Sequence, residues 1–86
     1  MPPLALIAPE ELKDVLVEDG YTVIFENEFH WFLVKDAKQQ APINIPKEPG
    51  EDGCVSMEIV EHVRNEAQIS YHKYFEIKKR LKAKAN

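Results

Sequence analysis

His30 is the residue whose type and setting best suit proton-transfer chemistry in this sequence. It lies near the start of a strand predicted over residues 29–35, directly after a predicted two-residue hairpin turn at Asn27 and Glu28. Histidine is the side chain whose unperturbed pKa lets it exchange protons near neutral pH. Alternation along the strand places two sets of side chains on opposite faces: Phe29, Trp31 and Leu33 on one, and His30, Phe32 and Val34 on the other. The sequence therefore offers either a general acid or base at an open strand end, or an ordinary structural histidine.

Other kinds of chemistry have less support. The remaining histidines, His62 and His72, are distant from His30, and Cys54 has no neighbouring cysteine, so no ligand spacing for a metal is present. The three glycines match no phosphate-binding or dinucleotide-binding fingerprint, and we expect no cofactor. We interpret Cys54 as a small loop residue, and His62 and His72 as ordinary helix residues. Trp31 is interpreted as a core anchor, with stacking of a nucleic-acid base as the alternative.

Apolar spacing predicts three helices. The first begins at Pro9, which is followed by two glutamates, and ends at Gly20, which is free to adopt a left-handed conformation. Ser56 is expected to cap the second helix and Ser70 the third, which should fray after Leu81. The stripes expected to face the core are Leu12, Val15 and Leu16; Ile59, Val60, Val63 and Ala67; and Tyr71, Tyr74 and Phe75.

Three strands are predicted between the first two helices, over residues 21–26, 29–35 and 42–45. In the first strand Tyr21, Val23 and Phe25 are expected to share one face. This order of elements predicts an α+β fold with a three-stranded antiparallel sheet and helices on one face. We expect residues 1–8 to be a loose lead-in, 9–81 a single domain, and 82–86 a frayed basic tail.

The charge of the chain is unevenly distributed. The net charge is −4, but residues 1–72 carry −9 and residues 73–86 carry +5. An acidic body does not suit a protein that coats nucleic acid by charge alone, so an RNA function would depend on a local patch. No apolar segment approaches the length needed to cross a bilayer, and one cysteine allows no intramolecular disulfide, so we expect a cytoplasmic protein.

Several short motifs follow one another in a recognisable order. They are Gly20-Tyr21 after the first helix, Glu28-Phe29-His30 and then Trp31-Phe32-Leu33-Val34, Ile43-Asn44-Ile45-Pro46, Pro49-Gly50, and an apolar helix over residues 55–67. In order and spacing this pattern resembles the HicA (YcfA-like) toxin family, over residues 12–74.

The resemblance implies a double-stranded-RNA-binding-like α-β-β-β-α fold with a short C-terminal helix, and a metal-independent endoribonuclease that acts on mRNA. His30 would take the proton from a ribose 2′-hydroxyl or give one to the leaving oxygen. Lys35, Lys47 and the C-terminal lysines are the candidates to bind phosphate, and Trp31 to stack a base. The implied partner is a HicB-like antitoxin protein; the oligomeric state stays open.

Two rival interpretations share this fold. Glu28 and Phe29 stand where the family has Gly-Ser, and together with the acidic body they suggest a non-catalytic module that binds a protein. A binder of structured RNA that does not cleave it is the third interpretation, for which affinity should fall steeply as salt rises.

Overall fold

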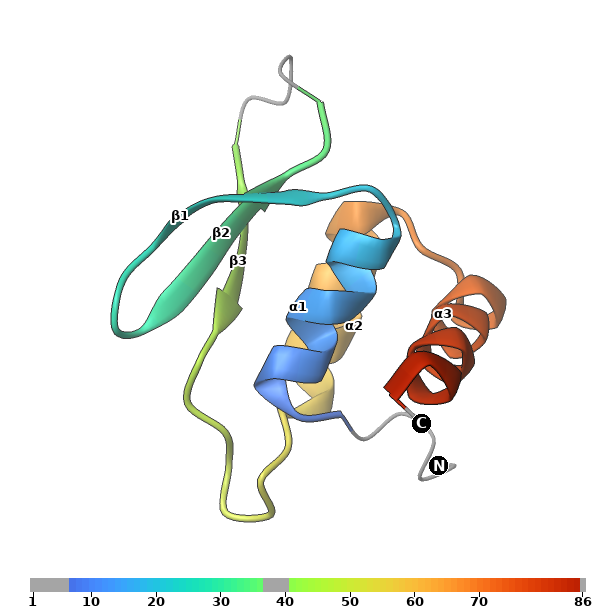
Figure 1. Cartoon of the computed structure of the whole chain (residues 1–86). Coiled ribbons are helices and arrows are strands. Elements are labelled where there is room, and N and C mark those ends of the chain that lie inside the picture. Colours follow the sequence, from blue (N-terminus) through green and yellow to red (C-terminus); the bar gives the residue numbers. More distant parts are fainter. Residues whose placement is uncertain (1–6, 37–40, 86) are drawn as a thin grey trace.

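The computed structural model describes residues 7–36 and 41–85 (Figure 1). Along the chain the elements are α1 (Pro9–Glu18), β1 (Thr22–Glu26), β2 (His30–Val34), β3 (Ile43–Pro46), α2 (Met57–Ala67) and α3 (Tyr71–Ala85). The strands form one antiparallel sheet in the order β1-β2-β3, and the helices lie on one side of it (Figure 1). The predicted α+β fold class and order of elements are confirmed.

The central strand β2 has one face toward the helices and one face away from them. Leu33 is fully buried and lies opposite Ile43 of β3, which fixes the helix-facing side. Because side chains alternate, Trp31 also faces the helices, whereas His30 and Phe32 face away. We call the side of the sheet that the helices leave uncovered the open face. The predicted alternation along residues 30–34 is confirmed.

A β-bulge in β1 overturns the prediction that Tyr21, Val23 and Phe25 share a face. Val23 pairs with Leu33, but Phe25 pairs with Phe32, so one extra residue, Ile24, is inserted between the two pairs. A bulge shifts the alternation by one position. Phe25 therefore lies on the open face beside Phe32.

Local signals at the helix ends act as predicted. Ser56 Oγ accepts a hydrogen bond from the Ile59 N–H (3.4 Å), and Ser70 Oγ accepts one from the Lys73 N–H (3.2 Å). Gly20 has a φ of +109°, and the chain turns there from α1 into β1. These caps determine where the helices begin and end.

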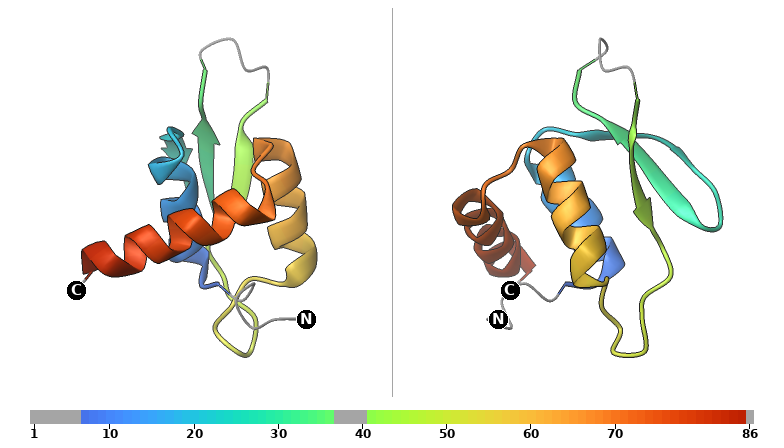
Figure 2. Two further views of the ribbon diagram at one scale, coloured as in Figure 1. Left: turned by 90° about the vertical axis from the view of Figure 1, so that its right-hand side faces the viewer. Right: turned by 180° about the vertical axis from the view of Figure 1, so that it is seen from behind.

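The molecule has three layers. α1 and α2 cover the sheet, and α3 packs against α1 on the side away from the strands; Figure 2 (left) shows α3 in front of both helices with the strands behind. The core fills the space between these layers. Its buried side chains are Ile7, Leu12, Val15, Leu16, Tyr21, Leu33, Ile43, Ile45, Val55, Val60, Val63, Ala67, Ile69, Tyr74 and Ile77.

Both ends of the domain differ from the prediction. Ile7 was expected in the loose lead-in, yet it is 1% exposed and its carbonyl accepts a hydrogen bond from the Val55 N–H (2.8 Å); residues 1–6 lie outside the described residues. α3 was expected to be short and to fray after Leu81. Its 15 residues make it the longest of the described helices, and it continues to Ala85; Lys84 near its end bonds Glu18 of α1.

Candidate functional site

The turn before β2 holds His30 through the side chain of Asn27. Asn27 Oδ1 accepts hydrogen bonds from the backbone N–H groups of Phe29 (2.8 Å) and His30 (2.9 Å), and the Asn27 N–H donates to the His30 carbonyl (3.1 Å). An asparagine that bonds the backbone two and three residues ahead forms a turn without glycine. Both the N–H and the carbonyl of His30 are therefore bonded to Asn27, which holds the backbone from which the imidazole extends.

His30 itself begins β2 and lies on the open face, half-buried, opposite Pro46 of β3. Its ring centroid is 6.0 Å from that of Phe32. Among the described residues, no side chain forms a hydrogen bond or an ion pair with the imidazole, so no carboxylate orients it as in a catalytic triad. Both ring nitrogens remain available to a ligand that approaches the sheet.

The open face around His30 is aromatic. Phe25 is 59% exposed, and its ring lies 5.4 Å from the ring of Phe32 at a tilted angle. On the other side of Phe32, Asn44 of β3 is paired with it and is exposed. A row of Phe25, Phe32 and Asn44 thus crosses the sheet next to His30 and Pro46.

Trp31 and Lys47 lie together, but on the opposite face from His30. The Trp31 ring is half-buried against the core, with the ammonium groups of Lys13 and Lys47 each 5.3 Å from its centroid. Lys47 also bonds the carboxylate of Glu26, which holds the pKa of Glu26 below its ordinary value. This arrangement supports the interpretation of Trp31 as a core anchor, and it gives Lys47 two partners on the helix-facing side.

Lys35 lies at the other end of β2 from His30. Four residues of strand lie between them, and the five residue steps place their backbones about 16 Å apart. The Lys35 ammonium is 3.2 Å from Asp19 and 5.6 Å from the centre of the Tyr21 ring. A charge this far away is beyond the Debye length of ~8 Å at physiological salt, so Lys35 does not bind a phosphate held at His30.

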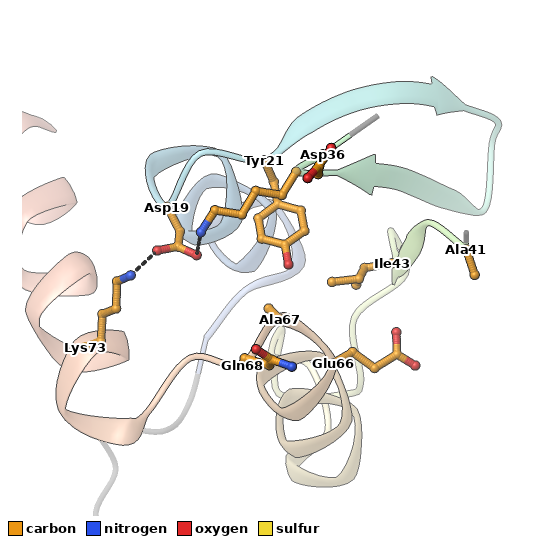
Figure 3. A pocket seen from close by; sticks show the side chains of 10 residues that line it. Asp19, Tyr21, Asp36, Ala41, Ile43, Glu66, Ala67, Gln68 and Lys73 are labelled. Carbon is orange, nitrogen blue, oxygen red and sulfur yellow. Dashed lines mark hydrogen bonds and ion pairs between the residues drawn. The ribbon is translucent and has the colours of Figure 1, made fainter. Parts of the chain in front are cut away.

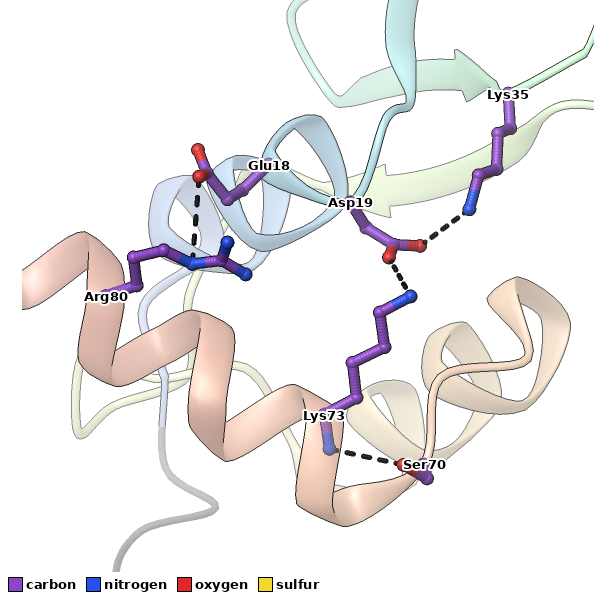
Figure 4. A network of polar contacts seen from close by, with 6 residues as sticks. All are labelled: Glu18, Asp19, Lys35, Ser70, Lys73 and Arg80. Atoms are coloured by element: carbon purple, nitrogen blue, oxygen red, sulfur yellow. Dashed lines mark hydrogen bonds and ion pairs between the residues drawn. The ribbon is translucent and has the colours of Figure 1, made fainter.

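Asp19 is one of the residues that line a hollow at this far end of the sheet (Figure 3). Its side chain is 3% exposed and is 2.6 Å from the ammonium of Lys73 and 3.2 Å from that of Lys35 (Figure 4). Burial by itself would raise the pKa of Asp19, but the hydrogen bonds and charges of the two lysines outweigh it and lower that pKa. The carboxylate and the two ammonium groups bond one another, so we interpret this cluster as structural. It links the end of α1, the end of β2 and α3.

Two basic residues of α3, Arg80 and Lys84, also turn toward α1 rather than toward the sheet. Arg80 Nε is 3.8 Å from Glu18 (Figure 4), and Lys84 Nζ is 3.0 Å from the same carboxylate. The layer formed by α1 and α2 separates α3 from the strands (Figure 1). The charge asymmetry of the sequence is thus partly neutralised within the molecule, and these residues do not supply positive potential at His30.

No group of three or more histidine, cysteine, aspartate or glutamate side chains in residues 7–36 and 41–85 is placed to hold a metal ion. None of the described helices combines the length and apolar character that spanning a membrane requires.

Comparison of the chain with protein-family models, with curated proteins and with solved structures finds no match.

Sequence reasoning missed two features of this site. The role of Asn27 had a local signal, because asparagine commonly bonds the backbone ahead of it in turns. The position of Phe25 on the open face had none, because a bulge depends on which residues of the neighbouring strand it must pair with.

Proposed function

We propose that this protein is a HicA-like endoribonuclease in which His30 is the general acid and base. The single observation that carries the proposal is the placement of His30 at the start of β2, on an uncovered sheet face, above a backbone that Asn27 holds in place. The resemblance of the sequence to HicA toxins implies this role for the same histidine, and the α-β-β-β-α order is the one expected from that resemblance. We place the activity in the cytoplasm, where mRNA is present.

The proposed reaction uses the nucleophile that RNA itself carries. His30 accepts the proton of a ribose 2′-hydroxyl while the 2′-oxygen forms a bond to the adjacent phosphorus. The bond from phosphorus to the 5′-oxygen breaks, and the imidazolium returns a proton to that oxygen. The products are a 2′,3′-cyclic phosphate and a 5′-hydroxyl. Proton transfer by a positioned side chain contributes about 10²–10⁴-fold to rate, which sets the scale of the loss expected without His30.

Among the described lysines, Lys47 is the nearest in the fold to the backbone of His30, but its ammonium lies over Trp31 on the helix-facing side, so we assign it no phosphate contact in this mechanism. It directly follows Pro46, the β3 partner of His30, and its N–H donates to the carbonyl of Phe29 (2.8 Å). Its ammonium bonds Glu26, whose side chain is 57% exposed.

The test is cleavage of RNA with metal ions chelated. We expect the parent protein to cleave and His30→Ala to lose about 10²–10⁴-fold in kcat. His72→Ala is the matched control, because His72 is a 90% exposed histidine on α3, away from the sheet. Equal activity in the parent and His30→Ala would exclude this mechanism. Detection of a cyclic phosphate end on the product would support the chemistry independently.

A second candidate function is a protein-binding module, and exposed apolar side chains favour it. Ile24, Phe25 and Phe29 are 55–61% exposed around the hairpin. The strands carry no lysine or arginine that would attract phosphate. The HicB-like antitoxin implied by the resemblance is the partner to test first. Binding that is lost in Phe29→Ser but kept in His30→Ala, with no RNA cleavage by the parent, would support this module.

A further inference from the structure

The open face of the sheet presents two aromatic rings beside the proposed catalytic histidine: the exposed ring of Phe25 and the half-buried ring of Phe32. The bulge at Ile24 turns Phe25 away from the core, and its ring then extends the ring of Phe32 across two strands. Phe25 stays 59% exposed, although burial would remove apolar surface from water. Without the bulge, alternation would have placed this ring on the helix-facing side. The exposed ring is therefore a consequence of the strand register.

The charge of this face suits bases better than phosphates. The three strands contain no lysine or arginine, and their one acid, Glu26, pairs with Lys47 on the helix-facing side. Glu28 in the adjoining turn repels phosphate. A nucleic acid that matches this charge would contact the open face with its uncharged bases, and its phosphates would point away from the sheet. The exposed amide of Asn44, paired with Phe32, can donate to and accept from the edge of a base.

A nucleic-acid base can stack on a side chain only when its own face is free. In a duplex both faces of each internal base are covered by neighbours, whereas unpaired bases can be splayed out and stacked on aromatic side chains. Such stacking contributes binding that tolerates any sequence, because every base has a π-face. An aromatic sheet without cations therefore selects single strands.

We infer that the substrate of this site is unpaired RNA, with bases stacked on the rings of Phe25 and Phe32 so that a ribose lies at His30. The inference rests on the proposed nuclease function and adds the substrate class to it. The 6.0 Å between the rings of His30 and Phe32 brings the ribose of a stacked nucleotide to the imidazole. Phe25 and Phe32 are binding and positioning residues, and the proton transfers remain with His30.

The experiment compares one labelled RNA, unpaired and annealed to its complement, in chelator. We expect the parent to cleave the unpaired form at least about 10-fold faster, because only that form can stack. Phe25→Leu, which keeps the apolar bulk and removes the ring, should raise KM about 5- to 100-fold with kcat much less changed. Phe25→Tyr keeps the ring and should behave as the parent. Val17→Ala, at an exposed apolar position on α1, is the control for loss of surface bulk.

Binding measured with the non-cleaving His30→Ala variant separates stacking from catalysis. Fluorescence anisotropy of the unpaired RNA should show affinity that changes little with salt, since each phosphate contact would add about −0.7 to the slope of log affinity against log salt. A steep slope would assign binding to lysines elsewhere and overturn the inference.

The outcomes distinguish the inference from the function on which it rests. If the parent cleaves paired and unpaired RNA equally, or Phe25→Leu matches Val17→Ala, the stacking site is wrong and the nuclease function stands. If the parent cleaves no RNA, the function fails. If, in addition, unpaired RNA does not bind, the inference fails as well. Binding of a protein that depends on Phe25 would then assign the two rings to a protein interface.

Discussion

Replacement of Asp19 by asparagine is expected to destabilise the protein by about 1–3 kcal/mol at neutral pH. The carboxylate is 3% exposed, and it bonds the ammonium groups of Lys73 (2.6 Å) and Lys35 (3.2 Å). It is also the C-cap residue of α1, where the helix dipole disfavours a negative charge. The two lysines must therefore offset both burial and the dipole, and asparagine offers them no charge.

The magnitude follows from the exposure of the partners. A hydrogen bond to a charged group contributes ~1.5–3 kcal/mol. The Lys35 and Lys73 side chains are 46% and 51% exposed, so solvent screens their side of each pair and the low end of that range applies. The amide oxygen of asparagine still accepts one hydrogen bond, which further limits the loss. For a domain of this size, 1 kcal/mol corresponds to roughly 4–8 °C in Tm, so the expected decrease is about 5–20 °C.

The effect of Asp19 depends on pH in a direction that the structure fixes. Its pKa in the folded protein lies below the ordinary value of 3.8, because the lysines outweigh the effect of burial. Between the folded pKa and 3.8 the unfolded chain binds more protons than the folded one. The stability contributed by Asp19 is therefore present above this window and is lost as pH falls through the folded pKa. The gap between the parent and Asp19→Asn should close in acid.

Thermal and urea unfolding followed by circular dichroism, at pH 7 and at acidic pH, measures this gap. Glu18→Gln is the matched control, because Glu18 is the next residue and its pairs with Arg80 and Lys84 are more exposed. We expect the control to lose less than about 1 kcal/mol. An Asp19→Asn variant as stable as Glu18→Gln at pH 7, or a gap that persists in acid, would refute the reasoning.

Three further changes test other parts of the structure. Asn27→Ala removes the acceptor of two backbone N–H groups, so we expect the free energy of unfolding in urea to fall by about 1 kcal/mol. In the cleavage assay kcat at saturating RNA should also fall, and an unchanged kcat would show that the turn does not position His30. Gly20→Ala should cost about 1–2 kcal/mol in the same unfolding experiment because φ is +109°, and no loss would mean that the turn relaxes freely. Burial raises the pKa of Tyr74 to about 12, so its contribution to stability is present below pH 10 and is lost as pH rises toward 12. Tyr74→Phe should keep its circular dichroism to higher pH than the parent, and earlier unfolding of the variant would contradict this assignment.

Much of the secondary structure could be predicted because its signals are local. Ser56 and Ser70 cap the helices that follow them, and Gly20 ends the first helix, since each acts on backbone groups within a few residues. The alternation that puts His30 and Leu33 on opposite faces also needs only a strand period of two. The candidate catalytic residue and its face were therefore predictable from sequence.

The tertiary structure decided which partners the charged side chains contact. Lys35 and Lys47 each follow a strand that pairs near His30. In the fold, Lys35 extends to Asp19 at the end of α1, and Lys47 packs over Trp31 of β2. Each partner lies 16 residues away in the chain. The order of residues does not state which carboxylate a long side chain will meet. Lys84, expected in a frayed tail, becomes ordered for the same reason, since Glu18 is brought to it by the packing of α3 on α1.

The sequence by itself determined the order of elements, the helix caps and the face of His30, because these depend on hydrogen bonds and periodicities within a few residues. Only the tertiary structure decided that Phe25 lies exposed beside Phe32, that the basic helix neutralises α1, and that Ile7 belongs to the core. Each of these depends on a pairing between segments far apart in the chain. The free energy of such a pairing depends on strand register and on burial, which local pattern does not encode.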